Sequence, residues 1–223
     1  MIDPEALPLD AAFAAHPGPA VPPGRLTPAA LRARFAQSLP WEPEQTTDGR
    51  IFVPGRAVRP AAVLIGLLEK DAALHVLLTV RAARLHDHAG QISFPGGGVE
   101  PEDANPIAAA LREAREEIGL DPGRVEVLGT LPEYRTVSSY CVTPVVALIG
   151  PGGALRPDPQ EVDETFTVPL AFLMDGAHHE RRLVTQEDTP RALYGMPYEG
   201  SRRYFIWGAT AAMLRNFYRF LLA

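Results

Sequence analysis

Residues 105–120 read Asn-Pro-Ile-Ala-Ala-Ala-Leu-Arg-Glu-Ala-Arg-Glu-Glu-Ile-Gly-Leu, a stretch that contains its own start and stop signals for a helix. Asn105 suits the N-cap position, and Pro106 suits the first helical position. Gly119 suits the left-handed residue that often follows the last helical turn. We therefore predict a helix over residues 106–118.

This helix has two chemically different faces. At about 100° per residue, one apolar stripe should face the core: Ile107, Leu111, Ala114 and Ile118. Glu113, Glu116 and Glu117 fall within an arc of roughly 100° on nearly the opposite side. These carboxylates repel one another beside the negative end of the helix dipole, and a divalent cation such as Mg²⁺ or Mn²⁺ would relieve the repulsion. The alternative is a solvated face on which Arg112 and Arg115 partner the glutamates.

A glycine-rich segment lies just upstream of the acidic helix. Gly96, Gly97 and Gly98 follow a short strand-like run, residues 91–94. Glycine permits positive φ and a close approach of the backbone to a neighbour. A bent loop here would add a backbone carbonyl to a metal shell and let a phosphate come near. The glycines therefore favour the metal interpretation.

Outside this region, short strands and helices mix without a regular βαβ alternation. A hairpin is predicted from 61–68 and 74–80, and a terminal helix over 209–222. Further strands are expected at 125–131, 143–149, 165–168, 183–186 and 204–207, and a single helical turn at 170–174. The pattern favours an α+β fold over a doubly wound sheet. The aromatic side chains of the terminal helix indicate either a core face or a dimer face.

The N-terminal quarter differs in composition, because 11 of the 23 prolines fall in residues 1–60. Residues 1–25 are predicted to be an irregular arm, since clustered prolines exclude a continuous helix. Thr27 is the expected N-cap of a short helix over 28–38. We therefore divide the chain into an arm with helix and linker, residues 1–58, and a compact domain, residues 59–223.

The composition of the chain limits the kinds of partner that we expect it to bind. Lys and Arg total 21 and Asp and Glu total 27, a formal net charge of −6 that argues against nucleic-acid binding through a broad basic surface. No apolar run approaches the roughly 20 residues of a membrane span, and no secretory signal is evident. The single cysteine, Cys141, excludes an internal disulfide framework. We expect a cytoplasmic protein without a membrane partner.

Residues 112–120 resemble the second half of the Nudix hydrolase box, G-x5-E-x7-R-E-U-x-E-E-x-G-U, where U is a bulky apolar residue. The first half departs from the box, because Gly97-x5-Asp103 is followed by eight residues before Arg112. Residues 77–97 read LLTVRAARLHDHAGQISFPGG and are similar to the block L-L-T-x-R-S-x-x-L-R-x-H-x-G-Q-x-x-F-P-G-G of the coenzyme A pyrophosphatase branch. Ala82 and His86 are the two departures from that block.

The resemblance implies a Nudix fold, with a mixed β-sheet core sandwiched between helices. It implies metal-dependent cleavage of the diphosphate of coenzyme A or its derivatives, giving 4′-phosphopantetheine (or its acyl form) and adenosine 3′,5′-bisphosphate. Alternatives are a Nudix enzyme for another small molecule, such as ADP-ribose, NADH or an oxidised nucleotide, and a non-catalytic ligand sensor. A homodimer is a further expectation.

The resemblance also implies residue roles. Glu113, Glu116, Glu117 and the Gly97 carbonyl would bind Mg²⁺ or Mn²⁺, and Arg112 would orient a glutamate. The general base is left open: Glu116 is one alternative.

Three acids in loops are further candidates for the base: Glu133, Glu161 and Glu164. For each, the alternative is an ordinary surface carboxylate.

Substrate contacts are expected from a second set of residues: Arg81, Arg84, Gln91, Gly96 and Gly97. For the two arginines, the alternative is a surface salt bridge.

Overall fold

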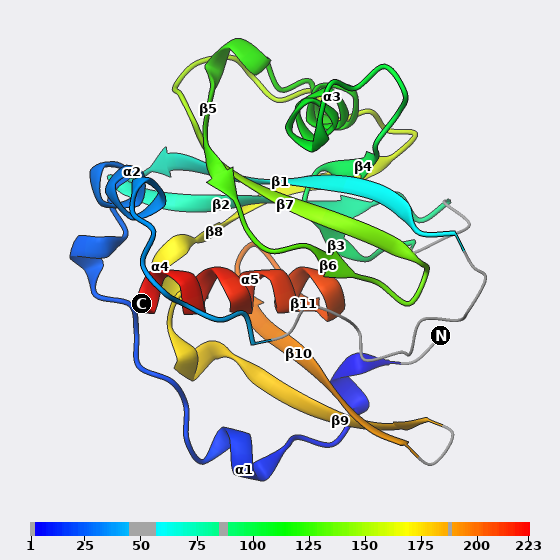
Figure 1. Cartoon of the computed structure of the whole chain (residues 1–223). Helices are drawn as coiled ribbons and strands as arrows, with labels where there is room; N and C mark the ends of the chain where they lie inside the picture. The colour runs from blue at the N-terminus through cyan, green and yellow to red at the C-terminus, as the bar shows by residue number, and fades with distance from the viewer. Residues whose placement is uncertain (1–2, 45–56, 85–88, 187–188) are drawn as a thin grey trace.

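The computed structural model describes residues 3–44, 57–84, 89–186 and 189–223. Within them, eight strands form one mixed sheet and three strands form a smaller antiparallel sheet. Helices cover both faces of the larger sheet, which confirms the α+β class and the predicted sandwich (Figure 1). No helix in the described ranges is long and apolar enough to cross a membrane.

The larger sheet is organised around a hairpin. Strands β1 (Arg59–Lys70) and β2 (Ala73–Arg81) are joined by Asp71 and Ala72, whose positive φ angles of 51° and 60° suit a tight two-residue turn. β1 also pairs in parallel with β7 (Tyr140–Ile149), which makes the sheet mixed.

The remaining strands extend this hairpin on both sides. β3 (Ile92–Ser93) and β8 (Val162–Pro169) pair with β2, and β4 (Gly96–Gly98) pairs with β1. β5 (Val125–Thr130) and β6 (Tyr134–Arg135) pair with β7.

Two apolar clusters pack on opposite faces of the sheet. Under α3 (Pro106–Ile118), the cluster joins alanines of the helix to Leu64 and Val145 of the sheet. On the other face, α5 (Gly208–Leu222) contributes Phe217, Tyr218, Phe220 and Leu221, which are almost completely buried within this chain. The terminal helix therefore presents a core face, and the alternative of a dimer face for these side chains was wrong.

The smaller sheet has the order β11-β10-β9, from β9 (Glu180–Gln186), β10 (Thr189–Glu199) and β11 (Arg203–Trp207). It lies beyond α5, on the side away from α3 (Figure 1). The single turn α4 (Leu170–Leu173) links β8 to this part of the chain. The expected strands at 183–186 and 204–207 are confirmed, whereas β10 was not predicted.

The N-terminal region contains more structure than the predicted irregular arm. Short helical turns occur at Pro4–Ala6 and α1 (Ala11–Ala14), and Thr27 caps α2 (Pro28–Ala36) as expected. The region also bonds to the terminal helix: Arg25 donates to the Leu221 carbonyl oxygen at 3.0 Å. Described residues 3–44 therefore pack on the compact part, while the division of the chain at residue 58 stays a prediction.

Candidate functional site

Helix α3 occupies residues 106–118, as predicted, because its ends are capped. The Asn105 side chain accepts a hydrogen bond from the Ala108 amide at 3.0 Å, and Gly119 is left-handed with φ 65°. Ala110 and Ala114 are buried on the sheet side, and their small side chains allow close packing. The helix contacts β1 and β4, so the glycine strand lies directly beside the acidic residues (Figure 1).

Glu117 differs from its expected position on the face opposite the core. It is 4% exposed and joins Ala110 and Ala114 on the buried side of the helix. The Gly96 amide donates to its carboxylate at 3.0 Å, and an Arg81 guanidinium nitrogen lies 4.0 Å away. Burial raises the pKa of Glu117 to about 7, although the Gly96 amide and the Arg81 charge oppose the rise. The site thus contains an acid whose charge is poorly compensated.

Glu113 lies against Gly97. A methyl group at Gly97 would come within 2.5 Å of the Glu113 carboxylate, so any larger residue there would have to displace the Glu113 side chain. Burial raises the pKa of Glu113 despite the nearby Arg112, and the negative charges of Glu116 and Glu161 contribute to the rise. The glycine strand and two of the predicted metal ligands therefore form one compact arrangement.

Arg112 connects the acids. One guanidinium nitrogen donates to Glu113 and to Glu116, each at 3.0 Å. A second donates to the Gly98 carbonyl oxygen at 2.9 Å, and Asp103 accepts two hydrogen bonds at 3.1 and 2.9 Å. These bonds raise the pKa of Arg112, with Asp103 as the largest cause.

Asp103 was not predicted as a site residue. The available signal was the Gly97-x5-Asp103 spacing, which places an acid near the position of the box's first glutamate.

The oxygen donors gathered beside α3 are those that a divalent cation prefers. Within the described ranges, no three Asp, Glu, His or Cys side chains already form a group that would hold a metal ion. Arg112 instead joins Glu113 and Glu116. The chemistry of the donors still fits Mg²⁺ or Mn²⁺, because both prefer carboxylate and carbonyl oxygens and Glu117 is a buried acid with a distant counterion.

The three acids outside α3 that are candidates for the general base lie in different places: Glu133, Glu161 and Glu164. The Glu161 carbonyl oxygen accepts from the Ala82 amide at 2.8 Å, and the charge of Glu161 acts on Glu113 and Glu117. Glu164 pairs in register with Val80, whose side chain belongs to the α5 side of the sheet, and Arg202 and Tyr204 donate to its carboxylate.

Glu164 lies in strand β8 and not in a loop, and strand alternation turns it to the face of the sheet opposite α3. Glu133 accepts a hydrogen bond from the Cys141 thiol at 3.0 Å.

The predicted substrate contacts also differ in position. Arg81 reaches toward Glu117, and its Nε is buried without a hydrogen-bond partner in the described part of the chain. Arg84 is exposed and donates to the Gln160 carbonyl oxygen at 3.3 Å. Gln91 lines a pocket at the edge of the sheet. His86 lies outside the described residues.

Comparison with known proteins gave consistent matches. A model of the NUDIX domain matches residues 58–187. The uncharacterized Nudix hydrolase NudL of Escherichia coli K12 is 43% identical over 159 residues, which cover 71% of this chain and 80% of NudL.

Solved structures also match. The Nudix hydrolase RenU of M. smegmatis shares 26% identity, with a TM-score of 0.43 over 50% of this chain and 71% of RenU. The NUDIX domain of Shewanella oneidensis NrtR, solved with ADP ribose, shares 23% identity, with a TM-score of 0.43 over 54% of this chain and 79% of that one.

Proposed function

Because the chain belongs to the Nudix family of hydrolases, we propose that it hydrolyses the diphosphate of coenzyme A or its derivatives with Mg²⁺ or Mn²⁺. Family membership makes it a pyrophosphohydrolase that acts on a small molecule. The coenzyme A substrate, the identity of the metal, a cytoplasmic location and a homodimer are proposals from the sequence.

One observation carries the substrate proposal. Three residues of the block similar to the coenzyme A pyrophosphatase branch contact glutamates of the acidic helix: Arg81, Gly96 and Gly97. Arg81 of this block approaches Glu117, and the Gly96 amide bonds to the same carboxylate. Gly97 contacts Glu113. Three of the residues that would contact the substrate therefore lie beside the glutamates that would hold the cation.

Each residue of the site has a proposed task. Glu113, Glu116, Glu117 and the Gly97 carbonyl would hold the cation, which when bound supplies positive charge to the diphosphate and makes water more acidic. Arg112 orients Glu113 and Glu116 through its two 3.0 Å hydrogen bonds.

Two residues act on the diphosphate and the water. Arg81, whose guanidinium lies 4.0 Å from the Glu117 carboxylate, would bind a phosphate oxygen. We assign Glu161 as the general base, because its charge acts on both Glu113 and Glu117, and Glu116 is the alternative.

The bond changes are simple. A water oxygen forms a bond to one phosphorus, and the bond from that phosphorus to the bridging oxygen breaks. The water proton leaves through the general base, and the bridging oxygen departs as part of the second phosphate. The products would be 4′-phosphopantetheine, or its acyl form, and adenosine 3′,5′-bisphosphate.

The direct test is incubation of the purified protein with coenzyme A and Mn²⁺, followed by chromatography of the products. We expect adenosine 3′,5′-bisphosphate in the wild type and in Glu102→Gln, an exposed control, and its loss in Glu117→Gln. A panel with ADP-ribose, NADH and an oxidised nucleotide runs in parallel. Faster turnover of any of these than of coenzyme A would reject the substrate assignment, and no turnover of any would favour a ligand sensor.

A further inference from the structure

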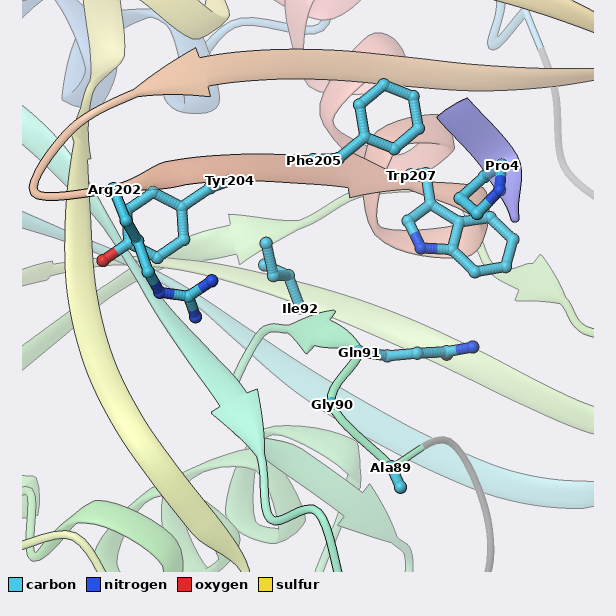
Figure 2. A pocket seen from close by; sticks show the side chains of 9 residues that line it. All are labelled: Pro4, Ala89, Gly90, Gln91, Ile92, Arg202, Tyr204, Phe205 and Trp207. Carbon is cyan, nitrogen blue, oxygen red and sulfur yellow. The ribbon is translucent and has the colours of Figure 1, made fainter. Parts of the chain in front are cut away.

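A pocket of about 230 Å³ lies at the edge of the sheet, between β11 and the chain that enters β3. Figure 2 shows the ring of Trp207 on one side and Gln91 on the other, with the ring of Phe205 on the far side of β11. Arg202 lies at the end nearer Tyr204, and Pro4, from the N-terminal region, lies beside Trp207 (Figure 2). The lining of the pocket thus includes the flat ring of Trp207, an amide side chain and a guanidinium.

Arg81 connects this pocket to the acidic site. Its backbone amide donates to the Gln91 carbonyl oxygen at 3.0 Å, and the Gly90 amide donates to the Arg81 carbonyl oxygen at 3.0 Å. Its side chain reaches to within 4.0 Å of the Glu117 carboxylate. A single residue therefore pairs with the pocket wall through its main chain and faces the acids through its side chain.

We propose that this pocket binds the adenine ring of the nucleoside diphosphate substrate, and that Pro4 of the N-terminal region forms one of its walls. The inference rests on the proposed function for the position of the diphosphate beside Arg81. Aromatic side chains such as Trp207 stack on bases. The volume of about 230 Å³ is large enough for one flat ring system.

The position of Pro4 depends on contacts of its neighbours. The Glu5 carboxylate accepts two hydrogen bonds from Arg203, at 2.9 and 2.7 Å. Arg182 donates to the Leu7 carbonyl oxygen at 2.9 Å. Glu199 contacts the same Arg203 but belongs to β10 and makes no link to the N-terminal region through that contact. Both Glu5 and Glu199 bind Arg203, but only Glu5 belongs to the N-terminal region, so variants of the two residues can test whether Pro4 forms a wall of the pocket.

The first experiment measures binding without turnover. The chain has two tryptophans, so Trp41→Phe leaves Trp207 as the only indole reporter. Titration with adenosine 5′-monophosphate, without metal, should quench the Trp207 fluorescence saturably, whereas 4′-phosphopantetheine should not. Calorimetry on the wild type and on Trp207→Ala repeats the test without the reporter, with an expected affinity loss of about tenfold. No response to the nucleotide, or an equal response to both ligands, would overturn the assignment.

The second experiment tests the wall. Glu5→Gln should weaken nucleotide binding by about three- to fivefold, and Glu199→Gln should leave it within about twofold. Equal effects would remove Pro4 from the proposal. The results also separate the two proposals. Coenzyme A cleavage without nucleotide quenching would overturn the pocket alone, and quenching without cleavage of any nucleotide would overturn the proposed function alone.

Discussion

The Glu117 carboxylate accepts a hydrogen bond from the Gly96 amide at 3.0 Å, and this contact joins the last turn of α3 to strand β4. Glutamine at position 117 can keep that bond through its amide oxygen while removing the buried charge. We expect Glu117→Gln to lose at least about a hundredfold in kcat and to melt no lower than the wild type without metal. Steady-state kinetics and thermal melts check both parts, and full activity in this variant would contradict the metal assignment.

Divalent metal should stabilise the folded protein by mass action. At a concentration of about 100 times Kd, a ligand that binds only the native state adds about 2.7 kcal/mol. We expect Tm to rise with millimolar Mg²⁺ or Mn²⁺ in the wild type and to stay constant in Glu117→Gln. The control is NaCl at matched ionic strength. A constant Tm in the wild type would argue against the site.

Gly97 and Gly98 provide a sharp comparison. A methyl group at Gly97 would meet the Glu113 carboxylate at 2.5 Å, whereas a methyl group at Gly98 would meet nothing within 4 Å. Gly97→Ala should displace Glu113 and lower kcat/KM by about tenfold or more, and Gly98→Ala should change it by less than about twofold. Similar kinetics in the two variants would exclude close positioning by Gly97.

Asp103 should matter for turnover although it was not predicted. It accepts two hydrogen bonds from Arg112, the residue that also bonds to Glu113 and Glu116. Asp103→Asn should lower kcat by about tenfold with a smaller change in KM, because Arg112 loses the charged partner that fixes its orientation. Glu102→Gln, exposed on the same loop, is the control. If kcat is unchanged in Asp103→Asn, the contact between Asp103 and Arg112 has a structural role and none in turnover.

Buried His179 should make stability depend on pH. Its Nε2 bonds to the Leu173 carbonyl oxygen at 2.8 Å and its Nδ1 to Arg215 at 2.9 Å, a pattern that requires the neutral ring. Burial lowers the pKa of His179 to about 4 from 6.5, with the Arg215 charge adding to the shift. The unfolded chain therefore binds the extra proton between these values, so stability falls as pH drops through this window.

The expected contribution of His179 is up to about 3 kcal/mol between pH 6.5 and pH 4. Urea unfolding at several pH values measures it as the difference in pH dependence between the wild type and His179→Gln. The glutamine variant should lose less stability on acidification. Parallel pH curves would contradict the assignment.

The acidic helix and the hairpin were predictable because their signals are local. Asn105, Pro106 and Gly119 mark the ends of α3 through the backbone conformations that they favour. The position of Glu117 was not predictable in the same way. A helical wheel has no information about β4, and it is this strand that bonds to the carboxylate and helps to bury it.

Strand β10 was missed because it contains Pro197, and proline normally argues against an internal strand. The two halves of β10 pair with different neighbours: Thr189–Gly195 with β9, and Gly195–Glu199 with β11. Pro197 therefore lies where only one side of the strand is paired. The structure of the N-terminal region could not be predicted either, because contacts such as Glu5 to Arg203 join residues far apart in the sequence.

The parallel pairing of β1 with β7 has a consequence for synthesis of the chain. Ten residue pairs, from Arg59 with Tyr140 to Leu68 with Ile149, join these strands. The hairpin of β1 and β2 leaves the ribosome before β7 has been synthesised. Until then, the edge of β1 that pairs with β7 has no partner strand. Such an edge is open to aggregation, and pairing between distant segments is slow. Nascent chains that stall before residue 140 should therefore recruit chaperones, and release of β7 should end that dependence.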